Sequence, residues 1–288
     1  MDVVVDVGGV YDPTEHRYDH HQPTFTDTFS PQHKTLLSSA GLVYKHFARE
    51  IITAKLGEVV SSESADLPST VETIYRRLYD TFVEPFDAND NGIAPYPSSI
   101  KAAFHRSWDI FAQVNILNPE WNEHNVDVDA RFEQAVSLVG SNFVAVLGRC
   151  IRSWLPARTI VLQSMNVATE GCDDECRDER LLILEQYCPW ADHLFELEKS
   201  TNVKAPLLYA IYEDSTKRSW RIHAVPREPD SFECRLALPA AWRGLRDSEL
   251  DAVVGMEGCV FVHRAGFIGA HKTRQGAIKM AILAANSQ

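Results

Sequence analysis

The chain has 288 residues, of which 45% are hydrophobic and 24% charged, so it is long enough for one large or two ordinary soluble domains. Its formal net charge of -12 argues against broad electrostatic binding of nucleic acid, although bound divalent metals reverse the local field at a carboxylate-rich site. There is no run of about 18 apolar residues and no signal or transit peptide, so we expect no membrane-spanning helix and no targeting segment.

The first half of the chain is predicted to contain one strand followed by helices. The valine-rich run at 2–7, DVVVDV, ends at Gly8-Gly9 and is typical of a buried parallel strand. The helical stretches expected after it, from apolar residues at helical spacing, are 35–56, about 69–86, 98–115 and 127–150.

The second half begins with a polar, acidic segment at 164–180, the best candidate for a boundary. Within it, Cys172 and Cys176 form a C-x3-C pair, but a zinc site needs two further ligands, so an acidic loop is favoured. We expect all six cysteines to be reduced thiols of an intracellular protein. The segments APLLYAIYED and RSWRIHAVPR predict an antiparallel hairpin. A short helix (RDSELDAVV), a strand (GCVFVHR) and a glycine-rich loop entering a C-terminal helix follow.

These elements predict an α/β protein in which a parallel-sheet domain precedes a smaller α/β domain with antiparallel strands. The expected ranges are 1–163 for the first domain, 164–200 for a linker or surface excursion, and 201–288 for the second domain. A cleft between the two domains is the default place for a ligand.

Acidic residues and histidines gather in the stretch VVVDVGGVYDPTEHRYDHHQ. Asp6 ends the first strand, at the edge where open α/β sheets bind ligands, although it could also cap the turn that follows. Asp19-His20-His21 is harder to explain as structure, because adjacent histidines beside an aspartate are poor in cores and in turns. Histidine with carboxylate suits manganese, iron or zinc, whereas carboxylate with water suits magnesium.

Adjacent side chains of an extended chain point in opposite directions, so we expect one histidine to bind metal while its neighbour faces the substrate. A further acidic pair, Asp87 and Asp90, lies at the end of a predicted helix in FDANDNG. Two metals about 3.5–4 Å apart could clamp a phosphoester, and Asp6, His20 and one of the acidic pair would supply about half of the ligands.

The ordered set of motifs resembles the Myg-type (melanocyte-proliferating-gene) exonuclease family of the DHH phosphoesterase superfamily. The match comprises VVVDVGGVYDP, HRYDHHQ, LSSAGLVY and NDNG, then LNPEWN, SWLPAR, CPW, WRGLRD and FVHRAGFIGAHKTRQGA, and it covers essentially the whole chain. The resemblance implies a DHH-type parallel-sheet domain. It also implies a manganese- or magnesium-dependent 3'-to-5' RNA exonuclease of mitochondrion and nucleus.

The resemblance also implies roles for residues of the acidic stretch. His21 would face the scissile phosphate. Asp19 would not bind metal itself but would support His20 or His21 and fix the orientation of that ring. Asp6 would bridge two metals. The implied metal ligands are Asp6, His20 and Asp90, or else Asp87.

Substrate binding is expected from two further places. Ser38 and Ser39 either hold a phosphate at a helix N-terminus or form an ordinary N-cap. In the C-terminal loop, Ala270 departs from the double glycine expected of the superfamily's substrate-holding element. The residues that the resemblance assigns to that element are Gly269, His271, Lys272 and Arg274.

The family also has an earlier His-x-x-x-x-His-x-Asp-Glu-like motif, which this sequence does not contain. We therefore expect an N-terminally truncated first domain with an incomplete two-metal site. Three functions stay open: an active exonuclease acting on RNA or another phosphodiester, an inactive homologue or isoform that binds RNA or a protein, and a pyrophosphatase or small-nucleotide phosphodiesterase. Aromatic residues at 104–111 and basic residues at 271–274 favour a longer substrate, since aromatics stack on bases and cations contact phosphates.

Overall fold

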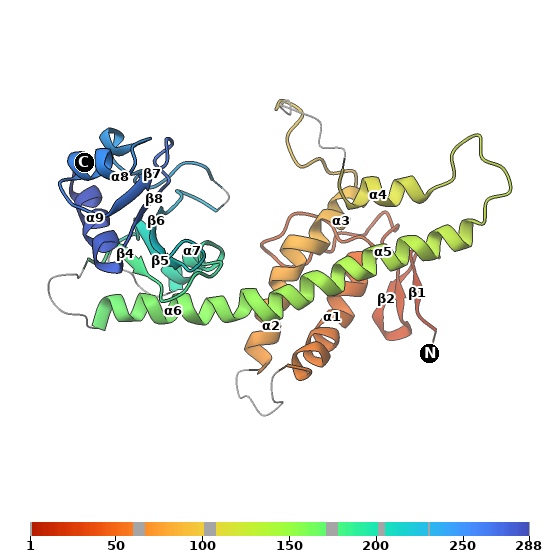
Figure 1. Cartoon of the computed structure of the whole chain (residues 1–288). Coiled ribbons are helices and arrows are strands. Elements are labelled where there is room, and N and C mark those ends of the chain that lie inside the picture. The colour runs from red at the N-terminus through yellow and green to blue at the C-terminus, as the bar shows by residue number, and fades with distance from the viewer. Residues whose placement is uncertain are drawn as a thin grey trace. The chain divides into compact units, whose positions relative to one another are not determined.

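The computed structural model describes residues 2–59, 67–100, 108–170, 178–200, 205–229 and 231–287. The chain divides into two compact units, Met1–Arg152 and Ser153–Gln288, whose helices and strands are drawn in Figure 1. Both units combine helices with a β-sheet, so the prediction of an α/β protein is confirmed.

A small three-stranded sheet opens the first unit. Its strands are β1 (Val4–Val5), β2 (Tyr11–Asp12) and β3 (Arg17–Tyr18), in the order β1-β3-β2. β1 runs parallel to β3, and the register pairs Val5 with Tyr18, but β2 runs antiparallel to β3, so the sheet is mixed and not the predicted parallel sheet. The prediction that this first strand is buried is wrong, because β1 lies at an edge of the sheet and the side chains of Val3, Val5 and Val7 are exposed.

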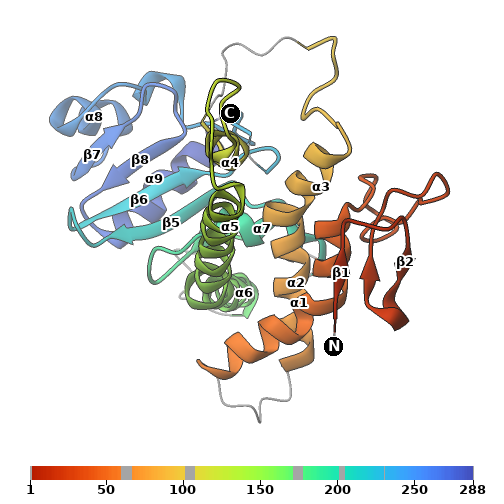
Figure 2. The ribbon, with the colours of Figure 1, turned by 90° about the vertical axis from the view of Figure 1, so that its right-hand side faces the viewer.

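Helices make up most of the rest of the first unit. In the described residues they are α1 (Ser39–Gly57), α2 (Leu67–Leu78), α3 (Glu84–Asp90), α4 (Ile110–Leu117) and α5 (Val128–Arg149), with a π-helical turn, Tyr79–Val83, between α2 and α3. α1 and α2 run side by side, and the small sheet lies along α1 (Figure 2). Each of the four predicted helical stretches therefore contains helix. In the stretch 98–115, residues 98–100 form a turn, and 101–107, with Phe104, lie outside the described residues.

The end of α5 continues through a second π-helical turn, Cys150–Trp154, into α6 (Leu155–Glu170) of the second unit. Within the described residues, the helical stretch Val128–Asn166 is long and apolar enough to cross a membrane. That criterion uses length and composition alone, and core helices of soluble proteins also meet it.

A five-stranded sheet forms the centre of the second unit. Its strands are β4 (Leu181–Ile183), β5 (Tyr209–Asp214), β6 (Ser219–Ala224), β7 (Cys259–Val262) and β8 (Ile268–His271), in the order β4-β5-β6-β8-β7. β4 and β5 are parallel and the other pairs are antiparallel, so the predicted β5–β6 hairpin is confirmed. β8 is a strand that the sequence analysis treated as loop.

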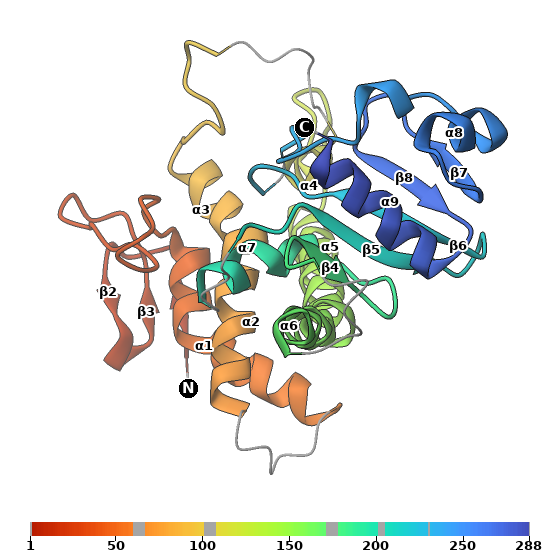
Figure 3. The same ribbon diagram turned by 90° about the vertical axis from the view of Figure 1, so that its left-hand side faces the viewer.

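Helices cover both faces of this sheet. Tyr209 and Ile211 of β5 pack with α8 (Asp247–Val254) and α9 (Arg274–Asn286), as Figure 3 shows for α9, while Ala210 and Tyr212 pack with α6 and α7 (Ala191–Ser200). Alternate residues of a strand point to opposite faces, so the first four residues of β5 are all buried because both faces are covered there, whereas Glu213 and Asp214 end the strand.

The range 164–200, predicted as a linker, contributes to the core of the second unit. It holds the end of α6, β4 and α7, and Leu182, Leu184, Leu194 and Leu197 are buried there. The acidic residues that suggested a linker, with Cys172 and Cys176, lie at 171–177, outside the described residues.

A buried carboxylate holds the N-terminus of α1 in the first unit. Ser38 is the N-cap residue, and its backbone amide and hydroxyl donate to Asp87 Oδ1 at 2.9 and 2.7 Å. Tyr79 donates its hydroxyl to Asp87 Oδ2 at 2.8 Å. Burial raises the pKa of Asp87, while these hydrogen bonds act against the rise. Gly41, in the first turn of α1, lies so close to Asp87 that a methyl group on Gly41 would overlap both oxygens of the Asp87 carboxylate.

Gly41→Ala is therefore expected to destabilise the protein by about 1–3 kcal/mol, because either Asp87 or α1 must move. Gly57→Ala, at the other end of the same helix, is the matched control, since no described atom lies within 4 Å of its added methyl group. Urea unfolding of the three proteins measures both effects. Equal stabilities for the two variants would contradict a tight clamp between Asp87 and α1.

Candidate metal centre

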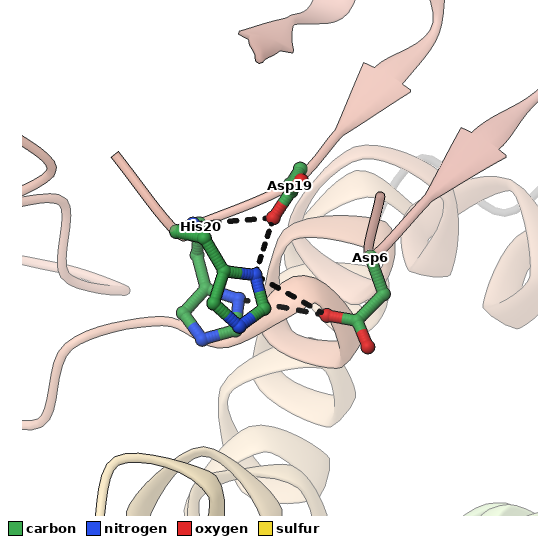
Figure 4. A group of neighbouring side chains, drawn as sticks. Asp6, Asp19 and His20 are labelled. Atoms are coloured by element: carbon green, nitrogen blue, oxygen red, sulfur yellow. Dashed lines mark hydrogen bonds and ion pairs between the residues drawn. The ribbon is translucent and has the colours of Figure 1, made fainter. Parts of the chain in front are cut away.

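Two neighbouring parallel strands bring acidic and imidazole side chains to one edge of the small sheet. Because Val5 pairs with Tyr18, the residues that follow them, Asp6 and Asp19, leave the sheet side by side. Asp6 has a φ of 62°, a left-handed conformation that Asp and Asn adopt more readily than most residues. Figure 4 shows the carboxylate of Asp6 facing the imidazole of His20 from the neighbouring strand end.

Asp19 anchors the segment around it. Its Oδ2 accepts from the Gly9 amide at 2.6 Å, and its Oδ1 accepts from the backbone amide and Nδ1 of His21 at 3.1 and 2.7 Å. Burial by itself would raise the pKa of Asp19, but the hydrogen bonds from His21 and Gly9 hold it at about 2. The hydrogen bond to Asp19 in turn raises the pKa of His21. Asp19 is therefore a buried, ionised carboxylate whose two oxygens are already engaged.

His20 is held between three other side chains. Its Nδ1 lies 3.0 Å from Ser39 Oγ and 3.8 Å from Asp6 Oδ1. Its Nε2 lies 3.0 Å from Oδ2 of Asp90, the last residue of α3. Ser39 thus fixes the orientation of the ring, a role that the sequence analysis missed. Its position beside a predicted helix N-cap was the available signal.

The rings of His20 and His21 lie on the same side of the chain. Their centroids are 4.3 Å apart, and His21 Nδ1 is 3.9 Å from Asp6 Oδ1, the oxygen that also faces His20. The prediction that they point in opposite directions is wrong, because β3 ends at Tyr18 and both histidines follow outside the strand. The side chain of His21 is 62% exposed and turned to solvent beside the cluster.

This cluster has the composition of a transition-metal site. Asp6, Asp19, His20 and His21 each offer a ligand atom within 4.8 Å of the others. Since Asp19 is engaged by hydrogen bonds, Asp6 and His20 are the members of this cluster that are best placed to bind an ion, and Asp90 contacts the other ring nitrogen of His20. A set of carboxylate oxygens with an imidazole nitrogen fits manganese, iron or zinc. A divalent metal therefore fits the site.

A cavity of about 470 Å³ opens beside these donors. Asp6, Asp90, Ser38 and Ser39 line part of it, so the two serines predicted to hold a phosphate do lie at the cavity. Ser38 is also the N-cap of α1, the alternative that the sequence analysis left open.

Asp87, the alternative to Asp90 as a metal ligand, lies in the protein interior and not beside His20. It is completely buried, and both of its oxygens are hydrogen-bonded by Ser38 and Tyr79. Asp90 lies one turn further along α3, is half exposed and faces His20. The structure thus brings Asp90 to the cluster and uses Asp87 to hold α1.

Comparisons with known proteins agree with this site. Residues 1–285 match the family model MYG1_exonuc, described as "Uncharacterised protein family (UPF0160)". The chain belongs to this family. The "MYG1 exonuclease" of Mus musculus is 43% identical over 285 residues, covering 97% of this chain and 72% of the mouse protein.

Other relatives give a similar result. The "MYG1 exonuclease" of Homo sapiens is 42% identical over 285 residues, covering 97% of this chain and 73% of the human protein. The "MYG1 protein C694.04c" of Schizosaccharomyces pombe is 42% identical over 283 residues, covering 97% of this chain and 82% of the yeast protein. No solved structure matches the chain.

Membership of the MYG1 exonuclease family confirms the resemblance seen in the sequence. The mouse and human relatives are exonucleases by name, so the family includes nucleases, and nucleic acid is the substrate class that the name implies. The cluster of acidic and histidine side chains fits the divalent metal expected of a metal-dependent nuclease.

The C-terminal residues that the resemblance assigns to substrate binding fall into two groups, one buried and one exposed. Gly269 and His271 are buried, and the His271 ring contacts the backbone oxygen of Glu257 at 2.9 Å and accepts from the Thr273 amide at 3.0 Å. A methyl group at Gly276 of α9 would overlap this ring. His271 therefore anchors α9 inside the second unit. Lys272 and Arg274, in contrast, lie on the surface, where a substrate can reach them.

His20→Gln is expected to weaken Mn²⁺ binding at least about tenfold because it removes an imidazole donor, and Ser39→Ala by about tenfold because the ring loses its orienting partner. His124→Gln, at an exposed histidine away from the cluster, is the control and should bind as the unmodified protein does. Titration calorimetry measures all four affinities. Unchanged affinity in His20→Gln would place the metal elsewhere.

Proposed function

We propose that this chain is a metal-dependent phosphodiesterase with a DHH-type site that removes nucleotides from the 3' end of RNA. The observation that carries the proposal is the convergence of Asp6, His20 and Asp90, from three separate elements, beside a cavity of about 470 Å³. The names of the mouse and human relatives support exonuclease activity. The resemblance to the Myg-type family supports RNA as substrate and the 3'-to-5' direction.

In the proposed reaction, Asp6, His20 and Asp90 hold the ion. A divalent ion bound there supplies Lewis-acid activation of water and neutralises charge on the phosphate. Ser39 keeps the His20 ring in position through Nδ1, so that Nε2 faces Asp90. The neutral form of His20 is the one that binds metal.

His21 acts on the phosphate in this proposal. Asp19 accepts from His21 Nδ1 at 2.7 Å, which leaves Nε2 for the substrate. The same contact raises the pKa of His21 and so favours the imidazolium. A cation beside the cluster can hydrogen-bond a phosphate oxygen or protonate the leaving oxygen. Asp19 is the positioning residue, because its buried carboxylate fixes the orientation of the His21 ring.

The two-metal form of the mechanism needs more donors than this cluster offers. A pair of ions requires a bridging carboxylate with ligands on both sides. Within the described residues, Asp6 Oδ1 lies 3.8 Å from Nδ1 of His20 and Asp90 Oδ2 lies 3.0 Å from Nε2, the other ring nitrogen, while Asp19 is engaged by Gly9 and His21. We propose that Asp6, His20 and Asp90 would hold one ion.

Titration calorimetry of the chain with Mn²⁺ should therefore show one site per chain. Asp90→Asn should weaken that site, whereas Asp80→Asn, an exposed aspartate that pairs with His33, should not. Two tight sites in this chain would show that further residues contribute ligands, and no site at all would support the inactive, RNA- or protein-binding alternative.

Asp6→Asn should lower Mn²⁺-dependent hydrolysis by at least about a hundredfold, because it removes a charged ligand from the metal. Asn also adopts the left-handed conformation of this position, so the fold should be retained, as circular dichroism can check. The assay compares RNA labelled at the 5' end with RNA whose 3' end is blocked. Full activity in Asp6→Asn would refute the proposed site.

Assaying RNA, a dinucleotide and pyrophosphate side by side separates the remaining alternatives. Turnover of RNA with stepwise loss from the 3' end supports the proposal. Turnover of pyrophosphate or the dinucleotide alone would replace it with a small-molecule phosphoesterase, for which the same cluster would serve.

A further inference from the structure

Four basic residues gather at one edge of the five-stranded sheet in the second unit. Lys217 and Arg218 belong to the turn between β5 and β6, Lys272 to the connection from β8 into α9, and Arg274 is the first residue of α9. We call these four residues the basic edge. All four are exposed.

The strand register brings the two halves of the basic edge together. β6 and β8 are antiparallel neighbours in which Trp220 pairs with His271, so the turn before Trp220 lies beside the connection after His271. The guanidinium of Arg274 stands 5.8 Å from the centre of the Trp220 ring. Trp220 is half-buried, packs against the core of the second unit and leaves part of its side chain exposed beside Arg274.

The cations of the basic edge are not neutralised inside the protein. Among the described residues, none of the four forms an ion pair, whereas five other arginines of the same unit do. These pairs are Arg158 with Glu196, Arg180 with Asp178, Arg221 with Asp214, Arg227 with Glu233, and Arg235 with Glu198. Acidic groups do lie close by: Glu213 and Glu257 are exposed at the same edge, and Lys272 helps to lower the pKa of Asp251.

Arg218 has a backbone conformation that does not suit arginine. Its φ is 48°, in the left-handed region where Gly or Asn is the usual choice. An arginine at the last position of this turn therefore costs stability that glycine would not. Within the described residues, no ion pair of the side chain offsets that cost.

We propose that the basic edge binds the phosphodiester backbone of a single-stranded polynucleotide, with Trp220 contacting a base. This inference rests on the proposed function and narrows its substrate class to a polymer, because a dinucleotide held at Asp6 and His20 has no further phosphates to offer. Cations without ion-pair partners around an aromatic ring are the combination that binds single strands. Lys217 and Arg218 are the new assignment, since nothing in the sequence pointed to this turn.

The test measures binding by fluorescence anisotropy with a labelled single-stranded RNA and a labelled dinucleotide, over a range of salt concentrations. The variant is Lys217→Ser with Arg218→Gly. It should bind the RNA about tenfold more weakly, and the slope of log affinity against log salt should fall by about 0.7 for each phosphate that the variant no longer neutralises. Binding of the dinucleotide should not change.

Arg218→Gly alone removes strain, so this variant should melt at the same or a higher temperature while it binds RNA more weakly. Loss of binding therefore cannot be attributed to unfolding. Arg227→Ala is the control, because Arg227 is an exposed arginine of the same unit that lies outside the basic edge and is paired with Glu233. It should leave RNA affinity and the salt slope unchanged.

Each outcome decides the inference. If the double variant bound RNA as tightly as the unmodified protein, the basic edge would not be a polymer site. The same would follow if the double variant bound RNA and the dinucleotide more weakly by the same factor. A protein that binds no RNA at all would also overturn the inference. RNA binding that depends on Lys217 and Arg218 in a protein without hydrolytic activity would uphold the basic edge and refute the proposed function, so the two failures are distinguishable.

Discussion

The parallel pairing of β1 with β3 is the constraint on which the candidate site depends. Each strand is only two residues long, and the pairing of Val5 with Tyr18 decides which residues come next to each other at the strand ends. A shift of the register by one residue would turn Asp6 away from Asp19 and His20. The Gly8-Gly9 turn supports this register, because the Gly9 amide donates to Asp19 and links the two strand ends.

Asp87 couples the helices to that sheet edge. Its carboxylate holds the N-terminus of α1 through Ser38, next to Ser39, which in turn contacts His20. Asp87 also fixes α3, and Asp90 lies three residues later on the same face of that helix. One buried carboxylate thus sets the positions of two groups that meet His20 on opposite sides of its ring. Its function is structural, although its spacing in the sequence resembles that of a ligand.

The two units differ in the local charge of their surfaces. In the first unit the site is carboxylate-rich and attracts a cation, and such a site repels phosphate until an ion is bound. In the second unit, exposed cations stand at a sheet edge without internal ion-pair partners among the described residues. An overall charge of -12 hides this local separation of charge, which explains why composition alone argued against nucleic acid.

The sequence by itself determined the α/β class, the β5–β6 hairpin, most helices and the family, because these depend on local apolar periodicity or on ordered motifs. It also pointed to Asp6 and His20 as candidate donors. It did not decide between Asp87 and Asp90, the direction of the two histidine rings, or the exposure of β1. It also missed the roles of Ser39 and His271. Those features depend on which groups are buried together, and residues such as Ser39 and His20, or Lys217 and Lys272, become neighbours only when strands and helices far apart in the chain pack in one register.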